Sequence, residues 1–119
     1  MKIGFATLLL FLATGPLALA GEIREGDTMY VRANSMWFES ASTLATWQRD
    51  KRRLSPKALK VHQDNLLGGR EAWQFITKQP VRIRRYWGTE HEVQVEMLSP
   101  GRLHGSVWWV DAEDCVGFI

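Results

Sequence analysis

The sequence predicts an α+β fold, in which a helical segment is inserted into a set of antiparallel strands. Apolar and polar residues alternate in residues 81–86 and again in residues 93–98, which is the period of a half-buried strand. Between about residues 40 and 78, apolar residues instead recur at helical spacing, and a helix-start signal occurs at residues 55–56. Strand-patterned segments on both sides of a helix-patterned segment predict one small domain that contains both strands and helices.

The β-patterned segments are bounded by turn signals. Residues 28–38 are rich in β-forming residues, and Asn34 and Ser35 mark a turn within them. Residues 99–101 read Ser-Pro-Gly, which is a tight-turn signal because proline presets one backbone angle and glycine allows a positive one. A further strand is predicted at residues 106–111, with Val-Trp-Trp-Val at its centre.

The alternation also predicts how the two central strands pair. Val81 and Ile83 stand at odd positions, as do the valines and the methionine of residues 93–97. Odd positions must therefore pair with odd positions if one face is buried. Arg82 or Arg84 then lies opposite Glu96 on the other face. Such a pair contributes only about 0.2–1 kcal/mol, so we expect it to select register rather than to carry function.

Two helices are predicted in the middle of the chain. Residues 40–53 carry Leu44 and Trp47 at helical spacing, and four of the last five residues are basic, where cations suit the negative end of the helix dipole. A Ser-Pro pair at residues 55–56 is a start signal for the second helix, and a Gly-Gly pair at residues 68–69 is a stop signal.

A short third helix is expected at residues 70–76, where Trp73 and Ile76 would be buried. The inserted segment would then hold two or three helices. His62 belongs to the second helix, and we expect it at the edge of the apolar face, held by a neighbouring side chain. A lone histidine in this setting is weak evidence for a bound ligand.

The first twenty residues have the pattern of a secretory signal peptide. Lys2 is followed by an uncharged, leucine-rich run, a Gly-Pro break, and small residues at the −3 and −1 positions before Gly21. The rival interpretation is an uncleaved anchor, because residues 3–20 are uncharged and approach the about 20 residues that span a bilayer. The small residues favour cleavage. We therefore expect a signal peptide at residues 1–20, one domain at residues 21–119 without a membrane span, and a periplasmic or secreted location.

The mature part is rich in tryptophan and has a single cysteine. All six tryptophans lie in it, and large rings suit a domain that is stable without disulfides. We expect most of them in the core and one or two at the surface as a recognition platform. Cys115 can form no internal disulfide. Burial is the favoured interpretation, with an intermolecular disulfide or a reactive thiol as alternatives.

Charge is divided into blocks along the chain. Residues 49–85 contain eleven lysines and arginines against three acids, whereas residues 86–119 contain one arginine against six acids. The basic block can attract anionic partners such as lipopolysaccharide phosphates, peptidoglycan carboxylates or an acidic protein face. The alternative is that it folds against the acidic end or is solvated. Nucleic acid is not favoured as a partner, because predicted export and a nearly neutral mature chain argue against it.

Two short segments resemble bacterial SH3-like domains. Residues 26–33, Gly-Asp-Thr-Met-Tyr-Val-Arg-Ala, resemble the first strand of that family. Residues 105–112, Gly-Ser-Val-Trp-Trp-Val-Asp-Ala, resemble its closing aromatic strand and the short turn after it. Residues 81–98 would form the central hairpin. The resemblance implies a small SH3-like antiparallel β-barrel used for binding, with residues 40–78 as a helical insertion where the family has a loop and a strand.

No catalytic signature accompanies these segments. The sequence has no nucleophile elbow, phosphate loop or zinc-ligand spacing, so we expect neither an enzyme nor a bound cofactor. Glu90, His91 and Glu92 carry metal-capable side chains, but neighbours in a strand point to opposite faces. Only a loop conformation would let them converge on a metal ion, so no metal site is predicted.

The candidate binding residues are Arg84, Arg85, Tyr86 and Trp87, where cationic and aromatic side chains adjoin at the end of a strand. Aromatic faces can stack on a sugar or a peptide while arginine pairs with a carboxylate. The alternative is that Tyr86 and Trp87 complete the core and the two arginines are solvated.

These observations favour an exported, non-catalytic binding module of the bacterial cell envelope, which binds peptidoglycan or an envelope protein. The second hypothesis is a secreted or periplasmic inhibitor or accessory protein that blocks an enzyme through a hairpin loop at residues 87–92. Both hypotheses place the function away from ATP, NAD and chromosomal DNA.

Overall fold

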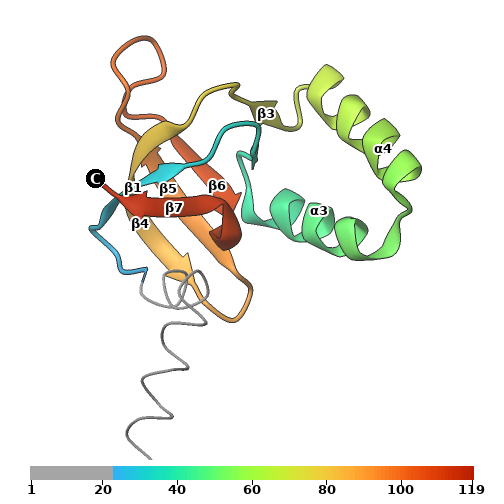
Figure 1. Cartoon of the computed structure of the whole chain (residues 1–119), viewed down its shortest axis with the longest axis horizontal. Helices are drawn as coiled ribbons and strands as arrows, with labels where there is room; N and C mark the ends of the chain where they lie inside the picture. Colours follow the sequence, from blue (N-terminus) through green and yellow to red (C-terminus); the bar gives the residue numbers. More distant parts are fainter. Residues whose placement is uncertain (1–22) are drawn as a thin grey trace, which may run out of the picture.

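The structure, a computed structural model, describes residues 23–119 and has the predicted α+β architecture (Figure 1). The predicted signal peptide at residues 1–20 lies outside the described residues. A five-stranded antiparallel sheet stands on one side of the molecule, and a pair of helices stands on the other. Within residues 23–119, no helix combines the length and the apolar character needed to cross a membrane.

The main sheet has the strand order β6-β5-β4-β1-β7. Its strands are β1 (Thr28–Val31), β4 (Gln79–Trp87), β5 (Glu92–Met97), β6 (Val107–Asp111) and β7 (Cys115–Phe118). A 3-10 helix, η1 (Ala112–Asp114), joins β6 to β7, which returns to pair with β1. In the described part of the chain the sheet is open, with β6 and β7 at its edges, so strand pairing does not close it into the expected barrel.

The register of the central hairpin is the predicted one. Val81 pairs with Met97 and Arg82 with Glu96, so odd positions meet odd positions. Arg84 also lies on the Glu96 side, where its Nη1 atom is 3.6 Å from Glu96 Oε1. Beyond Ile83 a bulge shifts the register, and the remaining residues of β4 pair one position later. The bulge decides which face each residue after Arg84 occupies.

Both predicted helices are confirmed, and Ser55 caps the second one as predicted. Helix α3 spans Ala41–Arg53, and its N-cap Ser40 accepts a hydrogen bond from the Thr43 amide at 3.2 Å. Helix α4 spans Pro56–Gly68, and the Ser55 hydroxyl oxygen accepts one from the Ala58 amide at 3.2 Å. Each cap satisfies an amide that the first turn of a helix leaves without a partner.

The predicted third helix at residues 70–76 is wrong. Residues Trp73–Gln74 instead form strand β3, which pairs with strand β2 (Met36–Trp37). Ile76, expected to be buried, is 83% exposed. The Trp73 ring meets the Trp108 ring edge to face, with centroids 5.9 Å apart. The extended β2–β3 pair thus lays the Trp73 ring against the sheet, and this tertiary packing overrides a weak helical pattern.

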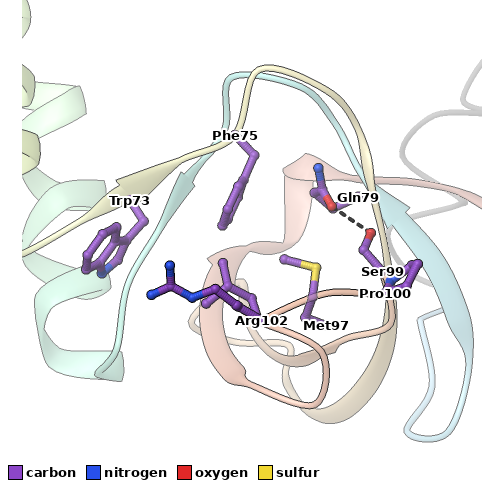
Figure 2. A pocket seen from close by; sticks show the side chains of 8 residues that line it. Trp73, Phe75, Gln79, Met97, Ser99, Pro100 and Arg102 are labelled. Atoms are coloured by element: carbon purple, nitrogen blue, oxygen red, sulfur yellow. Dashed lines mark hydrogen bonds between the residues drawn. The ribbon is translucent and has the colours of Figure 1, made fainter.

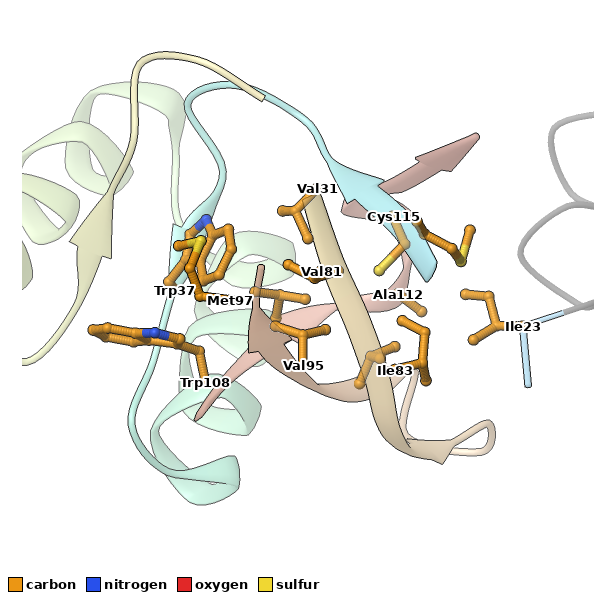
Figure 3. Packing of buried hydrophobic residues seen from close by; sticks show 13 residues of the cluster. Ile23, Val31, Trp37, Val81, Ile83, Val95, Met97, Trp108, Ala112 and Cys115 are labelled. Carbon is orange, nitrogen blue, oxygen red and sulfur yellow. The ribbon is translucent and has the colours of Figure 1, made fainter. Parts of the chain in front are cut away.

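Two hydrophobic cores lie on the two faces of the sheet. Figure 3 shows the first, in which the odd-numbered residues of the central hairpin meet Trp37, Trp108 and Cys115. The second core joins the sheet to the helices and is built from Met36, Phe38, Leu44, Trp47, Leu66, Ala72 and Trp109. Helix α3 packs on β5 and β6, while α4 packs on α3 at the outside of the molecule.

The tryptophans and the cysteine are placed as expected. Four tryptophans are buried, namely Trp37, Trp47, Trp108 and Trp109. Trp73 is half-buried and Trp87 is 40% exposed. Cys115 is buried at 4% exposure, and this burial raises the pKa of its thiol to about 12. The interpretation of Cys115 as a buried apolar residue is confirmed.

Candidate functional site

The four residues proposed for binding do not form one surface. Tyr86 pairs with Val93 and packs against the first core, whereas Trp87 lies on the opposite face, with its ring centroid 4.6 Å from that of Trp109. Arg84 is exposed near Glu96, and Arg85 is exposed on the next position of β4. Alternation along the strand separates the two aromatic rings, so of the four residues only Trp87 contributes an exposed aromatic face.

Trp87 begins a row of three residues that runs straight across β4, β5 and β6. It pairs with Glu92 on β5, and Glu92 pairs in turn with Asp111 on β6. The row is on the sheet face covered by α3. Both acids are buried, with 2% exposure for Glu92 and 7% for Asp111. Two carboxyl groups are therefore placed side by side beneath a helix.

Asp111 has a full set of donors for its carboxylate. The Gln48 side-chain amide donates to Oδ2 at 3.0 Å, and the Glu113 backbone amide donates to Oδ1 at 2.9 Å. Lys51 adds its ammonium group at 3.7 Å from Oδ2. These partners offset the cost of burying the charge.

Glu92 differs from Asp111 because the described residues supply no hydrogen bond or ion pair to its carboxyl group, whose oxygens are not among the fully buried polar atoms. Burial, followed by the nearby charges of Glu90 and Asp111, raises the pKa of Glu92 above its ordinary value of 4.5. The physical cause is that burial removes most of the water that would stabilise the ionised form, and the neighbouring acids repel its charge. A buried acid without a donor is an incomplete arrangement.

The carboxyl group of Glu92 lines a cavity of about 520 Å³ between α3 and the β4–β5 turn. The other lining residues are Ala41, Ser42, Ala45, Trp87 and Glu90. The alanines leave room beneath the first turns of the helix, the indole ring forms one wall, and two acids supply negative charge. We call this cavity the acidic pocket.

A second cavity, of about 550 Å³, is mainly apolar and lies between β3 and the β5–β6 loop. Its lining residues are Trp73, Phe75, Gln79, Met97, Ser99, Pro100, Arg102 and Leu103. Figure 2 shows the Arg102 side chain extending toward Trp73 and the hydrogen bond from the Ser99 hydroxyl to Gln79, which is 2.8 Å long. The buried Trp73 Nε1 has no hydrogen-bond acceptor among the described residues. We call this cavity the apolar groove.

A third arrangement lies between the two helices. Asp50 Oδ1 accepts a hydrogen bond from Arg53 at 2.7 Å, and Asp50 Oδ2 is 3.0 Å from His62 Nε2. The Arg53 hydrogen bond is the main reason that the pKa of Asp50 is lowered. The His62 ring also stacks on Trp47 at 5.9 Å. His62 thus lies against Trp47 and Asp50, but its buried Nε2 atom has no hydrogen-bond partner among the described residues, so the expected satisfaction by a neighbour is only partly met.

Sequence reasoning found parts of these sites and missed others. Trp87 was singled out as a binding residue and Glu92 as a metal-capable residue, and both belong to the hairpin loop considered as a plug, but the pocket that they share was not predicted. Glu90, His91 and Glu92 were weighed as metal ligands, and among residues 23–119 no group of three or more potential ligands converges on one point. The apolar groove was missed, because Trp73 and Leu103 become neighbours only through the unpredicted β2–β3 pair.

Comparisons of this chain with protein-family models, with curated proteins and with solved structures gave no match.

Proposed function

We propose that this chain is an exported, non-catalytic binding module of the bacterial cell envelope, built on an SH3-like arrangement of strands. The order of the strands supports the SH3-like part, because a β4-β5-β6 meander is flanked by β1 and by a last strand that returns to β1. The short η1 helix before β7 agrees with the turn expected after the aromatic strand. The helices α3 and α4 are the insertion between β1 and β4.

The apolar groove is the observation that carries the binding proposal. Its volume of about 550 Å³ is within the range of small-ligand sites, and such sites are typically apolar with a few polar groups. The eight lining residues include no histidine, cysteine or acid. This chemistry favours recognition of a ligand over its chemical conversion.

The lining also indicates the class of ligand. Phe75, Met97 and Leu103 can pack on an apolar side chain, and Arg102 can pair with a carboxylate. A short peptide with an apolar residue and a carboxylate supplies both features. The peptides of peptidoglycan and the segments of an envelope protein share this chemistry.

The inhibitor hypothesis receives less support from the hairpin at residues 87–92. The backbone carbonyl of His91 accepts hydrogen bonds from the Gln48 side chain at 3.1 Å and from the Ala112 amide at 2.8 Å. These bonds hold the turn against the body of the domain. A plug that enters another protein's active site would need to project from it.

The proposal is tested with the exported protein, produced from its full-length gene and recovered from the periplasmic fraction. Sedimentation with purified peptidoglycan measures binding to peptidoglycan, and crosslinking in intact envelopes measures binding to an envelope protein. Leu103→Asp should lower the bound fraction about tenfold, since it places a charge in an apolar wall. Val61→Asp on α4 is the matched control, because Val61 is also an exposed aliphatic residue, at 56% exposure.

Two results would overturn this function. One is a wild-type protein that neither sediments with peptidoglycan nor crosslinks to an envelope protein. The other is equal binding by the Leu103→Asp and Val61→Asp variants. The mass of the recovered protein checks export separately, because cleavage before Gly21 would remove residues 1–20.

A further inference from the structure

We propose that the acidic pocket binds a primary ammonium group carried on an aliphatic stem. The observation behind this proposal is that Glu92 is 2% exposed, lines the pocket, and receives no hydrogen bond or ion pair from the described residues, while its carboxyl oxygens are not fully buried. The inference is independent of the apolar groove, which shares no lining residue with this pocket.

The neighbouring acid of the same row indicates what Glu92 lacks. Asp111 is buried beside it and is held by the Gln48 amide and by the Lys51 ammonium group. Lys51 thus supplies a primary ammonium group to one carboxylate of the pair. A second such group, brought by a ligand, would complete the arrangement at Glu92 in the same way.

The pocket walls fit the two parts of such a ligand. An ammonium group has three donors, and the pocket offers acceptors on Glu90, Glu92 and Ser42. The exposed face of Trp87 can attract the cation and cover the methylene groups next to it. Ala41 and Ala45 have short side chains, which leaves space for the aliphatic stem along α3.

Other ligand classes fit this pocket less well. A metal ion requires several converging protein ligands, and residues 23–119 provide no group of three or more. An anion would be repelled by Glu90 and Glu92. The N-terminus of α3 carries partial positive charge, but its effect is about 0.3–1 kcal/mol and Ser40 already accepts from one of the free amides. The negative charge of the Glu90 and Glu92 carboxylates outweighs this partial positive charge.

The direct test uses N-acetyl-lysine N-methylamide as the probe and its ε-acetylated analogue as the neutral control. Calorimetry with the exported protein should give a binding constant about tenfold stronger for the charged probe. Glu92→Gln keeps the size of the side chain and should weaken binding of the charged probe about tenfold. Glu25→Gln is the matched control, since Glu25 is exposed in the turn before β1, and should leave binding unchanged.

A second measurement needs no variant. The carboxyl carbon of Glu92 should shift in the NMR spectrum when the charged probe is added, and it should not shift with the acetylated analogue. Butylamine, added in parallel, distinguishes a small free amine from a lysine of a partner chain. Binding of both compounds assigns the pocket to any alkylammonium group, and binding of the lysine derivative alone assigns it to a peptide.

The proposal is overturned if the charged and acetylated probes bind equally, or if Glu92→Gln and wild-type protein bind the charged probe equally. Leu103→Asp should bind the charged probe as wild type does, because the groove and the pocket are separate. A failure of this inference is therefore distinguishable from a failure of the binding function proposed for the groove.

Discussion

Trp108 and Trp109 are neighbours in the chain, yet their rings belong to different hydrophobic cores on opposite faces of the sheet. Trp108 meets the rings of Trp37, Trp73 and Phe75, whereas Trp109 meets the ring of Trp87. Strand β6 therefore joins the two halves of the domain through consecutive side chains. The helical pair and the β2–β3 pair are both fixed to the sheet at this point.

We expect Trp108→Ala and Trp109→Ala to destabilise the domain by a similar amount, about 3–5 kcal/mol each, because both remove a large buried ring. Their local effects should differ. Hydrogen exchange should become faster in α3 and α4 for Trp109→Ala, and in β2 and β3 for Trp108→Ala. Identical exchange patterns for the two variants would contradict the separation of the cores.

Cys115 should resist alkylation in the folded protein. With a pKa of about 12, only about one thiol in ten thousand is ionised at about pH 8, and the sulfur is also buried. Iodoacetamide should label it only after denaturant unfolds the chain, so labelling reports global opening. Rapid labelling without denaturant, or a dimer on a non-reducing gel, would contradict this expectation.

Glu92→Gln should raise the stability of the unliganded protein at neutral pH. The pKa of Glu92 is raised in the folded state, so the folded protein holds its proton more tightly than the unfolded chain does. Stability is therefore lost as the pH rises from 4.5 through the folded pKa. Glutamine cannot ionise and avoids this loss.

The measurement for Glu92 is the difference in melting temperature between Glu92→Gln and wild type across this pH range. The difference should be small at about pH 4 and should grow toward about pH 8. Glu25→Gln provides the control for removing an exposed acid. A difference that does not change with pH would show that burial of Glu92 carries no such cost.

Asp50→Asn should loosen the contact between α3 and α4. The pKa of Asp50 is lowered, mainly by the hydrogen bond from Arg53, so its contribution is present above 3.8 and is lost as the pH falls through the folded value. Faster hydrogen exchange in α4 should result, because His62 loses its charged partner. Among residues 23–119 the exposed Asp64 pairs with Lys60 alone, so Asp64→Asn is the control and should leave exchange in α4 much closer to wild type.

Local signals in the sequence predicted the helices and the central hairpin. Ser55 acts within one turn of its own helix, and the odd-numbered residues of β4 and β5 can be buried together in only one register. Neither conclusion required knowledge of distant contacts. Predicting the bulge after Ile83 would have required such knowledge. Because of this bulge, alternation along β4 alone does not determine which faces Tyr86 and Trp87 occupy.

Long-range packing explains what sequence reasoning missed. Strand β3 has two residues, and β7 has four with a glycine among them, so neither carries enough periodicity to be recognised. Strand β3 is held by pairing with β2, and strand β7 is held by pairing with β1. The acidic pocket was missed for a related reason. Its Ala41 and Ala45 lie on a helix, and the sequence does not indicate which strands that helix covers.

The β2–β3 pair has a consequence for how this domain can vary. Met36 pairs with Gln74 and Trp37 with Trp73, so the chain leaves this separate two-stranded sheet and returns to it at adjacent points. The segment between β2 and β3, which includes both helices, therefore has its two ends held together by this strand pairing. Its length can change without moving any strand of the main sheet, provided that its side chains still cover Trp109 and still pair with Asp111 as Gln48 and Lys51 do. The helical pair is thus the part of the molecule that can be exchanged while the sheet stays the same.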